Sequence, residues 1–362
     1  MNTLTLHLAH LEHNYKVLRK QLQPKTQMVA VVKAQAYGSA TLPFVRRLVQ
    51  LGVDALAVAY TEEGVELREA GIDLPILVFY PQADTLEALL DAHLEPCLYS
   101  RSLVNRFKVL LQQKQQQHYP VHIKYNTGLQ RVGFNTTDTA WILEAMELEC
   151  FQLRSVYSHL AASEAPRPCS LCDDQIMQFE KLKTAYQKAC DPPPKFHLLN
   201  SSGVFNYPEH QNEMVRCGIA LHGFANRPEW DALLKPIARL STQICQLHHV
   251  QKGSYVGYDH GWQAPQDSVI ATLPLGHADG IGRHYGHGRG SVEINGQRAL
   301  IVGNVCMDML MVNVTNIACK EGDKVLFFGG QSTAADFAKS ANSISYELLT
   351  GLGSRIQKVI EE

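Results

Sequence analysis

The chain lacks a long hydrophobic run and a clear excess of charge of either sign. No stretch of its 362 residues approaches the ~20 consecutive apolar residues that cross a bilayer, so a membrane-spanning role is not expected. Its 33 Lys and Arg residues nearly balance its 35 Asp and Glu residues, which leaves a formal net charge of −2. This balance provides no broad positive field for nucleic acid or anionic membranes, and a small-molecule substrate fits better.

The sequence also lacks a disulfide framework and a complete set of metal ligands. The nine cysteines are an odd number scattered through the chain, and the opening segment Met1–Leu6 has no basic region followed by a long apolar run. This pattern favours free thiols in a reducing compartment, and we expect a cytoplasmic protein. Cys169 and Cys172 have zinc or redox spacing, but no second Cys-x-x-Cys or His-x-x-x-His stands nearby. No metal site is predicted.

Strand-like runs alternate with helix-like segments through the first part of the chain. A chain of 362 residues exceeds the size at which one hydrophobic core usually stops growing, so two domains are expected. Eight strands with helices between them are typical of parallel βαβ units and predict a (β/α)8 TIM-like barrel over residues 1–229. The eight runs are Met28–Val32, Ala55–Ala59, Ile76–Phe79, Pro96–Tyr99, Val121–Tyr125, Leu153–Ser158, Phe196–Leu199 and Met214–Ile219. The amphipathic segments between them include Leu42–Leu51, Thr61–Ala70, Ser102–Gln117 and Asp174–Cys190.

The pattern changes after about residue 230. Shorter runs with period-two alternation and Gly turns replace the helical periodicity, which predicts a second, mainly β domain over residues 230–362. One late helix is expected within Ser332–Leu349. The predicted strand runs are Ile237–Leu247, Ser268–Leu275, Gly290–Ile301, Met309–Val314 and Lys324–Phe328.

Polar residues follow several of the eight runs at the point where each run ends. Barrel active sites are assembled from the loops at the carboxyl ends of the strands, so these residues are expected to meet. Lys33 is the most informative of them, because a partly desolvated lysine can attack an aldehyde such as pyridoxal phosphate to form a Schiff base. The others are Lys124, Arg131, His159, Asn200–Ser202, Arg216 and Gly218.

Three segments of the sequence carry a resemblance to a known family. Val31–Gly38 contains Lys33 followed by Tyr-Gly, Lys124–Phe134 contains Arg131, and Met214–Ile219 contains Arg216. Together they resemble the alanine racemases, which are barrel-type (fold type III) pyridoxal-phosphate enzymes. Further segments agree in order over essentially the whole chain: Ser158–Ala161, Asn200–Ser202, Val256–Tyr258, Gly276–Gly280, Val305–Asp308 and Ser345–Glu347.

The resemblance implies a two-base reaction that interconverts L-alanine and D-alanine and supplies D-alanine for peptidoglycan or catabolism. Lys33 would carry pyridoxal 5'-phosphate and exchange the α-proton on one face, and Tyr258 would act on the opposite face. Racemisation needs groups on both faces, because a single base tends to return the proton to the side it came from. In the family this tyrosine comes from the partner subunit, which implies a homodimer with composite active sites.

The remaining roles also come from the resemblance. Arg216 would face the pyridine nitrogen and keep it unprotonated, because a guanidinium only donates hydrogen bonds. Arg131 would contact the cofactor and the substrate carboxylate, and Met307 from the partner chain would cap the substrate pocket. The other cofactor-binding residues would be Tyr37, His159, Ser201, Gly218, Ile219 and Tyr346.

The sequence departs from the family at three positions and leaves the substrate open. Gln35 and Asn126 stand where acidic residues are common, and His277 replaces the usual tyrosine at the entrance. Lys124 resembles a lysine that is carbamylated in some members, and an unmodified lysine beside Arg131 would need an acidic neighbour. A serine or broad-spectrum racemase, a related decarboxylase and a pyridoxal-phosphate carrier are the alternatives.

Overall fold

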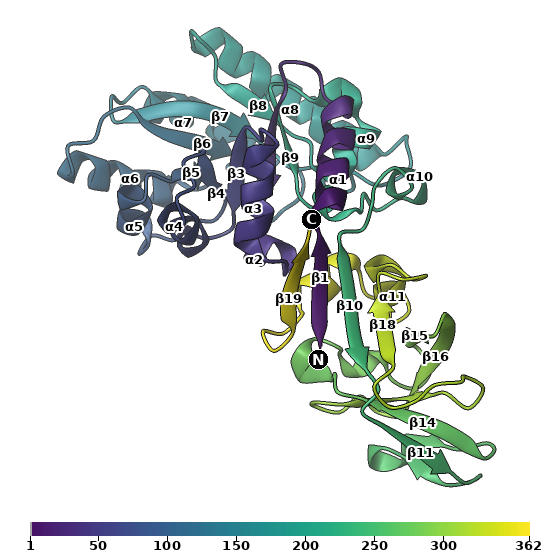
Figure 1. Cartoon of the computed structure of the whole chain (residues 1–362). Coiled ribbons are helices and arrows are strands. Elements are labelled where there is room, and N and C mark those ends of the chain that lie inside the picture. Colours follow the sequence, from purple (N-terminus) through teal and green to yellow (C-terminus); the bar gives the residue numbers. More distant parts are fainter. Residues whose placement is uncertain (1) are drawn as a thin grey trace.

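The computed structural model describes residues 2–362, and a parallel barrel forms one of its two lobes (Figure 1). The eight barrel strands lie in the order β8-β7-β6-β5-β4-β3-β2-β9, and all neighbouring pairs are parallel. The two ends of this order meet where the Arg216 amide donates a hydrogen bond of 3.0 Å to the Leu199 carbonyl. The predicted TIM-like barrel is therefore confirmed. Its strands are β2 (Gln27–Val31), β3 (Ala55–Val58), β4 (Ile76–Val78), β5 (Glu95–Leu98), β6 (Tyr119–Lys124), β7 (Phe151–Tyr157), β8 (Lys195–His197) and β9 (Met214–Cys217).

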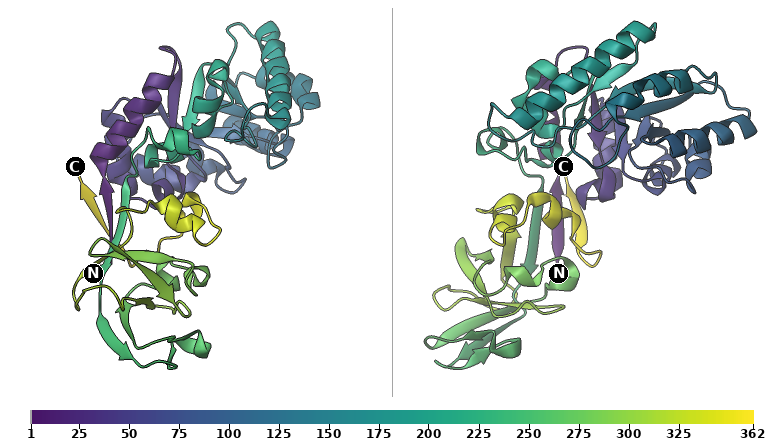
Figure 2. Two further views of the ribbon diagram at one scale, coloured as in Figure 1. Left: turned by 90° about the vertical axis from the view of Figure 1, so that its right-hand side faces the viewer. Right: turned by 180° about the vertical axis from the view of Figure 1, so that it is seen from behind.

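Helices surround the barrel and cover the outer face of its strands (Figure 2). The α3 helix buries Phe44, Val45 and Leu48, whose three- and four-residue spacing places them on one face. Strands such as β3 are buried along their whole length, as expected for a parallel sheet covered on both faces. The helices are α1 (Leu8–Gln21), α2 (Lys33–Tyr37), α3 (Thr41–Gln50), α4 (Thr61–Glu69), α5 (Leu86–Asp91), α6 (Arg101–Gln113), α7 (Thr139–Met146), α8 (Ser170–Ala189), α9 (Ser201–Asn206) and α10 (Pro228–Asp231).

A nine-stranded sheet forms most of the second part, in the order β11-β14-β17-β16-β15-β18-β10-β1-β19. It confirms the predicted mainly β C-terminal region. The remaining elements are β10 (Ala238–Gln243), β11 (Gln246–Val250), β12 (Tyr255–Val256), β13 (Trp262–Gln263), β14 (Ser268–Leu273), β15 (Ser291–Ile294), β16 (Gln297–Val302), β17 (Leu310–Asn313), β18 (Lys324–Phe328), α11 (Ala334–Lys339), α12 (Ser345–Thr350) and β19 (Gln357–Glu361). The short 3₁₀ turns are η1 (Thr136–Asp138), η2 (Pro208–His210), η3 (Ile219–His222), η4 (Tyr258–His260), η5 (His277–Asp279) and η6 (Arg283–Tyr285).

The first strand of the chain lies in this C-terminal sheet and not in the barrel. β1 (Thr3–His7) pairs antiparallel with β10 and parallel with β19, so both ends of the chain meet in one sheet (Figure 1). Leu4 and Leu6 point into the core while the residues between them are partly exposed. This strand is absent from the runs predicted from the sequence, although its alternation is of the kind that marks a half-buried strand.

Three predicted elements of the C-terminal region are subdivided in the structure. The run 237–247 is two strands, β10 and β11, and the run 290–301 is a hairpin of β15 and β16. Asn295 and Gly296, with φ of 49° and 74°, form its two-residue turn, and such positive angles suit the twist of a hairpin. The single late helix is two short helices, α11 and α12, because Asn342 at φ 58° interrupts the helical backbone between them.

Helix α12 holds the C-terminal region against the mouth of the barrel. A β-carbon on Gly38, which follows α2, would overlap the Leu349 carbonyl oxygen of α12, so the two backbones approach as closely as glycine allows. This contact carries Tyr346 of α12 to the carboxyl ends of the barrel strands, where its ring centroid lies 6.0 Å from that of Tyr37. Within residues 2–362 no helix is long and apolar enough to cross a bilayer.

Candidate active site

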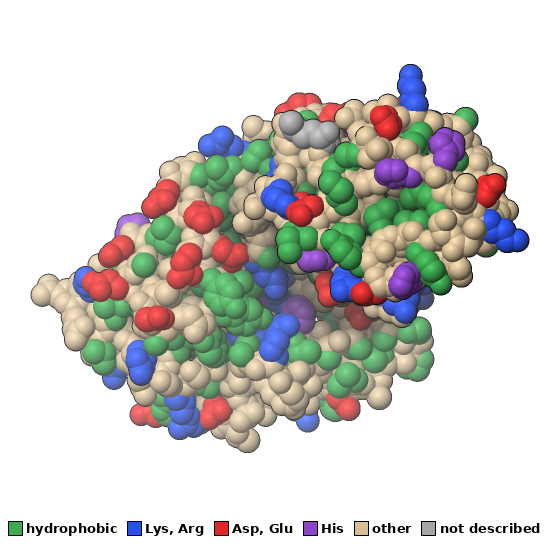
Figure 3. Space-filling model, turned by 90° about the horizontal axis from the view of Figure 1, so that it is seen from below, with side chains coloured by type: hydrophobic (Ala, Val, Ile, Leu, Met, Phe, Trp, Pro, Cys, Tyr) green, Lys and Arg blue, Asp and Glu red, His purple; other side chains and the backbone are tan. Residues whose placement is uncertain are grey.

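A cavity of about 280 Å³ opens at the carboxyl ends of the barrel strands. Blue Lys and Arg and purple His side chains gather in the hollow between the two lobes of the molecule (Figure 3). All nine residues predicted to bind the cofactor line this one cavity, which is the strongest agreement between the sequence and the geometry. They are Lys33, Tyr37, Arg131, His159, Ser201, Arg216, Gly218, Ile219 and Tyr346.

The segment that follows Lys33 has an unusual backbone. Ala34, Gln35, Ala36 and Tyr37 all have positive φ, between 50° and 56°, so α2 is a left-handed turn of four residues other than glycine. Such a turn costs roughly 1–2 kcal/mol per residue, and strain of this kind collects at functional sites. Glu63 of α4 supports the turn by accepting hydrogen bonds from the Ala34 and Ala59 amides.

Positive side chains dominate the cavity. None of the described residues that line it is Asp or Glu. Four of the lining residues have basic side chains: Lys33, Lys124, Arg131 and Arg216. Burial lowers the pKa of Lys33, and the nearby positive charge of Arg131 lowers it further. The amine is thereby available as a base or nucleophile closer to neutral pH than an exposed lysine. The cavity itself suits an anionic ligand.

Arg216 is buried and lies beneath the cavity with both terminal nitrogens occupied. Its Nη2 donates hydrogen bonds to the carbonyls of Ser158 (2.7 Å) and Leu198 (3.0 Å) and to Nδ1 of His159 (3.1 Å). Its Nη1 donates to Nδ1 of His197 at 2.8 Å. Nε makes no hydrogen bond to any residue from 2 to 362, so it is the donor left for a ligand. Burial lowers the pKa of Arg216 to about 10, so it remains a cation at neutral pH.

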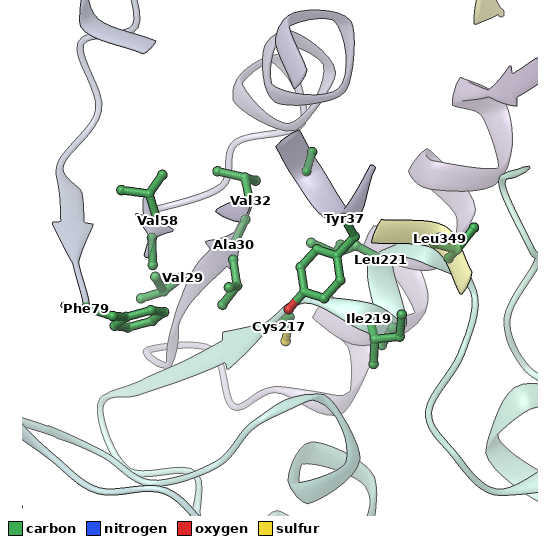
Figure 4. Close-up of a cluster of buried hydrophobic side chains, with 14 of the residues drawn as sticks. Val29, Ala30, Val32, Tyr37, Val58, Phe79, Cys217, Ile219, Leu221 and Leu349 are labelled. Carbon is green, nitrogen blue, oxygen red and sulfur yellow. The ribbon is translucent and has the colours of Figure 1, made fainter. Parts of the chain in front are cut away.

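One wall of the cavity is a close contact between Tyr37 and Gly218. A β-carbon on Gly218 would overlap the Tyr37 hydroxyl, so no larger residue fits while that tyrosine stays in place. Ser201 Oγ accepts hydrogen bonds from the amides of Gly218 (3.0 Å) and Ala220 (3.3 Å) and fixes the turn after β9. In Figure 4 the Tyr37 ring lies among Cys217, Ile219 and Leu221. Hydroxyls and backbone amides thus converge beside the cationic part of the cavity.

Comparison with known families assigns both parts of the chain. The model of the alanine racemase N-terminal domain matches residues 6–226, and that of the alanine racemase C-terminal domain matches residues 237–360. The chain belongs to the alanine racemase family. The alanine racemase of Sorangium cellulosum is 33% identical over 373 residues, covering 99% of this chain and 98% of its own. The protein is accordingly an amino-acid racemase, an isomerase.

Solved alanine racemases share the whole fold. The enzyme from D-cycloserine-producing Streptomyces lavendulae superposes with a TM-score of 0.94 at 26% identity, covering 100% of this chain and 97% of its own. The alanine racemase of Bartonella henselae, a structure with covalently bound pyridoxal phosphate, gives a TM-score of 0.89 at 27% identity, covering 99% of both chains. The resemblance read from the motifs is confirmed.

Lys124 of this racemase has no acidic neighbour in the cavity. It is 5% exposed and donates a hydrogen bond of 3.0 Å to the Tyr125 carbonyl. Burial, together with the charges of Arg216 and Arg131, holds the pKa of Lys124 well below its ordinary value. Because a lowered pKa favours the uncharged amine, it weakens the repulsion expected between Lys124 and Arg131 where the cavity lining holds no acidic partner. A neutral amine is also the form that carbon dioxide carbamylates.

Tyr258 and Met307 do not line the Lys33 cavity of the same chain. Both line a separate hollow on the C-terminal part of the racemase and are 70% and 59% exposed. Tyr258 follows Gly257 at φ 77° and precedes Asp259 and His260 at φ 55° and 53°. A strained backbone thus presents an exposed tyrosine, which is typical of a functional loop.

The three departures from the family all lie outside the cavity lining. Gln35 is turned towards Lys358 of β19, and Asn126 accepts hydrogen bonds from the Gly128 and Gln130 amides in the loop that carries Arg131. His277 is exposed, and its amide donates a hydrogen bond of 2.9 Å to the Cys306 carbonyl, next to Met307. His277 therefore shares a surface with the residue predicted to cap the substrate pocket.

Two residues with ring side chains near the site, Tyr157 and His197, are absent from the residues predicted from the sequence. Tyr157 lines the cavity, and the His197 ring stacks on it with centroids 4.6 Å apart and planes 8° apart. The available signal was a polar residue inside an otherwise apolar barrel strand, since such a side chain must face the barrel interior or its outer helices. Residues 2–362 contain no cluster of three potential metal ligands.

The charge of Arg131 should control the titration of Lys33. In Arg131→Gln the pKa of Lys33 is expected to rise, so at a given pH below its titration midpoint more of the amine is protonated and acetylation is slower. Competitive labelling with acetic anhydride across a pH series, read by mass spectrometry in the cofactor-free racemase, measures this. Arg101→Gln is the control, because Arg101 pairs with Asp138 at 2.6 Å on the surface. An unchanged midpoint in Arg131→Gln would contradict the assignment.

Proposed function

We propose that this racemase interconverts L-alanine and D-alanine with pyridoxal 5'-phosphate as cofactor. One observation carries the proposal: a lysine with a lowered pKa stands at the end of β2 in a cavity lined by cations and by no described carboxylate. An anionic cofactor that condenses with a lysine amine matches both properties. The family membership and the Bartonella structure with bound pyridoxal phosphate support the same cofactor.

The residues that are present fit that cofactor. Lys33 would bind it covalently, and Tyr37, Ser201, Gly218, Ile219 and Tyr346 would hold its phosphate, since hydroxyls and backbone amides suit a fixed phosphate. When bound, the cofactor supplies an electron sink that acidifies the substrate α-proton. The close fit of Gly218 against Tyr37 keeps this end of the cavity open.

The basic side chains of the cavity would take the remaining roles in cofactor binding, substrate binding and proton transfer. Arg216 would point its free Nε–H at the ring nitrogen. A guanidinium does not give up its proton near neutral pH, so it would donate a hydrogen bond to that nitrogen without protonating it. His159 holds Nη2 of Arg216 and contributes to the floor of the cofactor site. Arg131, exposed at the rim, would bind the substrate carboxylate. Lys33 would move the α-proton on the barrel side of the substrate.

Tyr258 would move the proton on the opposite side, from a partner subunit. The hollow that contains Tyr258 and Met307 also exposes Tyr255 and Met309, which are 53% and 47% accessible. An exposed apolar surface of this kind marks an interaction site. A homodimer in which each C-terminal part covers the other barrel would complete both sites, with Met307 capping the substrate pocket.

The biological role follows from the same proposal. D-Alanine made by this enzyme would supply peptidoglycan synthesis, and the nine cysteines are all free thiols, in keeping with a cytoplasmic enzyme. A serine or broader racemase is the second candidate. The observation that favours it is His277, which stands beside Met307 where the family has tyrosine, because a smaller and titratable ring changes the size and polarity of that surface.

Removing either base should abolish racemisation. Lys33→Ala is expected to lose cofactor attachment and turnover, and Tyr258→Phe should lower kcat by at least about 10²-fold, since general acid-base groups contribute on that scale. Circular dichroism of L-alanine and of D-alanine measures both directions. Tyr255→Phe, a similarly exposed tyrosine on the same surface, is the matched control and should keep full activity. Normal turnover in Tyr258→Phe would sink the two-base assignment.

A composite site predicts complementation between two inactive variants. Co-expressed Lys33→Ala and Tyr258→Phe chains should regain about a quarter of the parental activity, because random pairing makes half of the dimers mixed and each mixed dimer has one intact site. Separately tagged chains, purified through both tags, isolate the mixed dimers. If these dimers stay inactive while the parent is active, each site belongs to a single chain.

The substrate preference should depend on His277. His277→Tyr is expected to raise the ratio of kcat/KM for alanine over serine, because the larger ring restricts the entrance. Parallel circular dichroism assays of L-alanine and L-serine with parent and variant measure the ratio, and His284→Tyr in the same exposed region serves as control. An identical ratio in all three proteins would remove His277 as a determinant of specificity.

A further inference from the structure

A continuous chain of buried hydrogen bonds connects Arg216 with Glu95. Arg216 Nη1 lies 2.8 Å from His197 Nδ1, and His197 Nε2 lies 2.7 Å from Ser155 Oγ. Ser155 Oγ lies 2.6 Å from His122 Nδ1, and His122 Nε2 lies 2.8 Å from Glu95 Oε2. The five side chains come from β9, β8, β7, β6 and β5, five strands that are consecutive around the barrel.

The chemistry of the Arg216 end fixes the direction of this chain. A guanidinium has only donors, so Nδ1 of His197 must accept. Burial and the charge of Arg216 keep the pKa of His197 well below its ordinary value, so the neutral ring carries its proton on Nε2 and donates to Ser155. When His122 is neutral with its proton on Nε2, the Ser155 hydroxyl donates to His122 Nδ1, and His122 donates from Nε2 to Glu95. Every donor points away from Arg216 and towards the carboxylate.

Glu95 lies at the opposite end of the barrel from the active site. It is the first residue of β5 and lines a separate hollow of about 210 Å³ together with Asp54, Arg154 and Lys195. Burial alone would raise the pKa of Glu95, but its hydrogen bond to His122 and the charges of Arg154 and Arg68 bring it below its ordinary value. Glu95 is therefore a carboxylate at neutral pH.

Through this series of hydrogen bonds, the Glu95 carboxylate acts as a counter-charge for the buried Arg216 without direct contact between the two side chains. No carboxylate of residues 2–362 forms an ion pair with Arg216. A carboxylate in direct contact would compete with any ligand for the guanidinium and would place a negative charge in a cavity that holds an anion. A relayed carboxylate polarises His197 as an acceptor and leaves Nε–H of Arg216 free.

We propose that Glu95 is a remote positioning residue of the racemase, which orients and holds Arg216 through His122, Ser155 and His197. The proposal rests on the proposed function, in which Nε–H of Arg216 meets the cofactor ring. Loss of the Glu95 charge weakens the acceptor at His197 and loosens the guanidinium beneath the cofactor. Substrate binding through Arg131 is untouched, so the effect falls on kcat and not on KM.

The test is a double-mutant cycle between Glu95→Gln and Ser155→Ala in the full-length protein. Glu95→Gln keeps a hydrogen-bond acceptor and removes the charge, and Ser155→Ala cuts the chain in its middle. With ¹⁵N-histidine labelling, the His197 Nδ1 resonance is recorded before and after loading with pyridoxal 5'-phosphate. Glu95→Gln should move this resonance in the parent and should no longer move it once Ser155 is alanine.

Kinetics and absorption complete the cycle. Glu95→Gln is expected to lower kcat for L-alanine by about threefold to tenfold, the range typical of coupling through a side-chain network, with KM nearly unchanged. The visible absorption of the bound cofactor should shift in Glu95→Gln and Ser155→Ala alike. Asp54→Asn is the matched control: it removes one negative charge from the same hollow without a place in the chain, and it should leave the His197 resonance, kcat and absorption unchanged.

Each outcome is decisive. An unmoved His197 resonance, or an equal movement in the Ser155→Ala background, overturns the relay. A resonance that moves while kcat and the cofactor spectrum stay constant overturns the positioning role. A parent protein without racemase activity whose His197 still responds to Glu95 refutes the proposed function and leaves the relay standing. If Glu95→Gln is not recovered folded, Ser155→Ala alone must show the fall in kcat and the altered spectrum, and normal values there contradict the proposal.

Discussion

The buried positive charge of Arg216 is the constraint on which the interior of the barrel depends. An uncompensated charge in a protein core costs several kcal/mol, and here no described carboxylate contacts it. Three carbonyls and two imidazole nitrogens take its hydrogen bonds instead. Those partners must be neutral and correctly protonated, which burial ensures by keeping the pKa values of His159 and His197 low. Histidine and serine inside β6, β7 and β8 are therefore part of the active-site design.

The backbone of the segment that presents Lys33 is conformationally strained. Four residues without glycine's freedom adopt left-handed angles between β2 and Gly38, and the hydrogen bonds from Glu63 and the contact with α12 hold them there. The strain aims Lys33 into the cavity and places the Tyr37 ring against Gly218. Because α12 belongs to the C-terminal region, the geometry of the barrel site depends on how the two parts of the chain pack.

The sequence was sufficient for the barrel because most of its buried parallel strands are short apolar runs, and several of these end in a polar residue, as at Lys33 and His159. It was insufficient where long-range pairing decides the structure: β1 joins strands more than two hundred residues away, and nothing local indicates that partner. The left-handed turn after Lys33 opposes the local preference of Ala-Gln-Ala for a right-handed helix, so tertiary contacts determine it. The hydrogen-bond chain from Arg216 to Glu95 could be predicted only with the strand register in hand, since neighbours across β6 and β7 such as His122 and Ser155 are far apart in sequence.

The charges in the cavity also determine how the chain responds to a ligand. Burial and neighbouring positive charges lower the pKa values of Lys33 and Lys124, whereas Arg216, with a pKa of about 10, stays charged at neutral pH, so the site remains positive. A bound anion removes that repulsion and binds only the folded barrel, and stability then rises with ligand concentration. The backbone of the Tyr258 loop is held by a hydrogen bond from the Asn304 side chain to the Tyr258 carbonyl, but residues 2–362 of one chain provide little cover for its side chain, which is 70% exposed. Under the proposed function, the barrel of a second subunit supplies that cover, so that folding, cofactor binding and dimerisation each complete the same site.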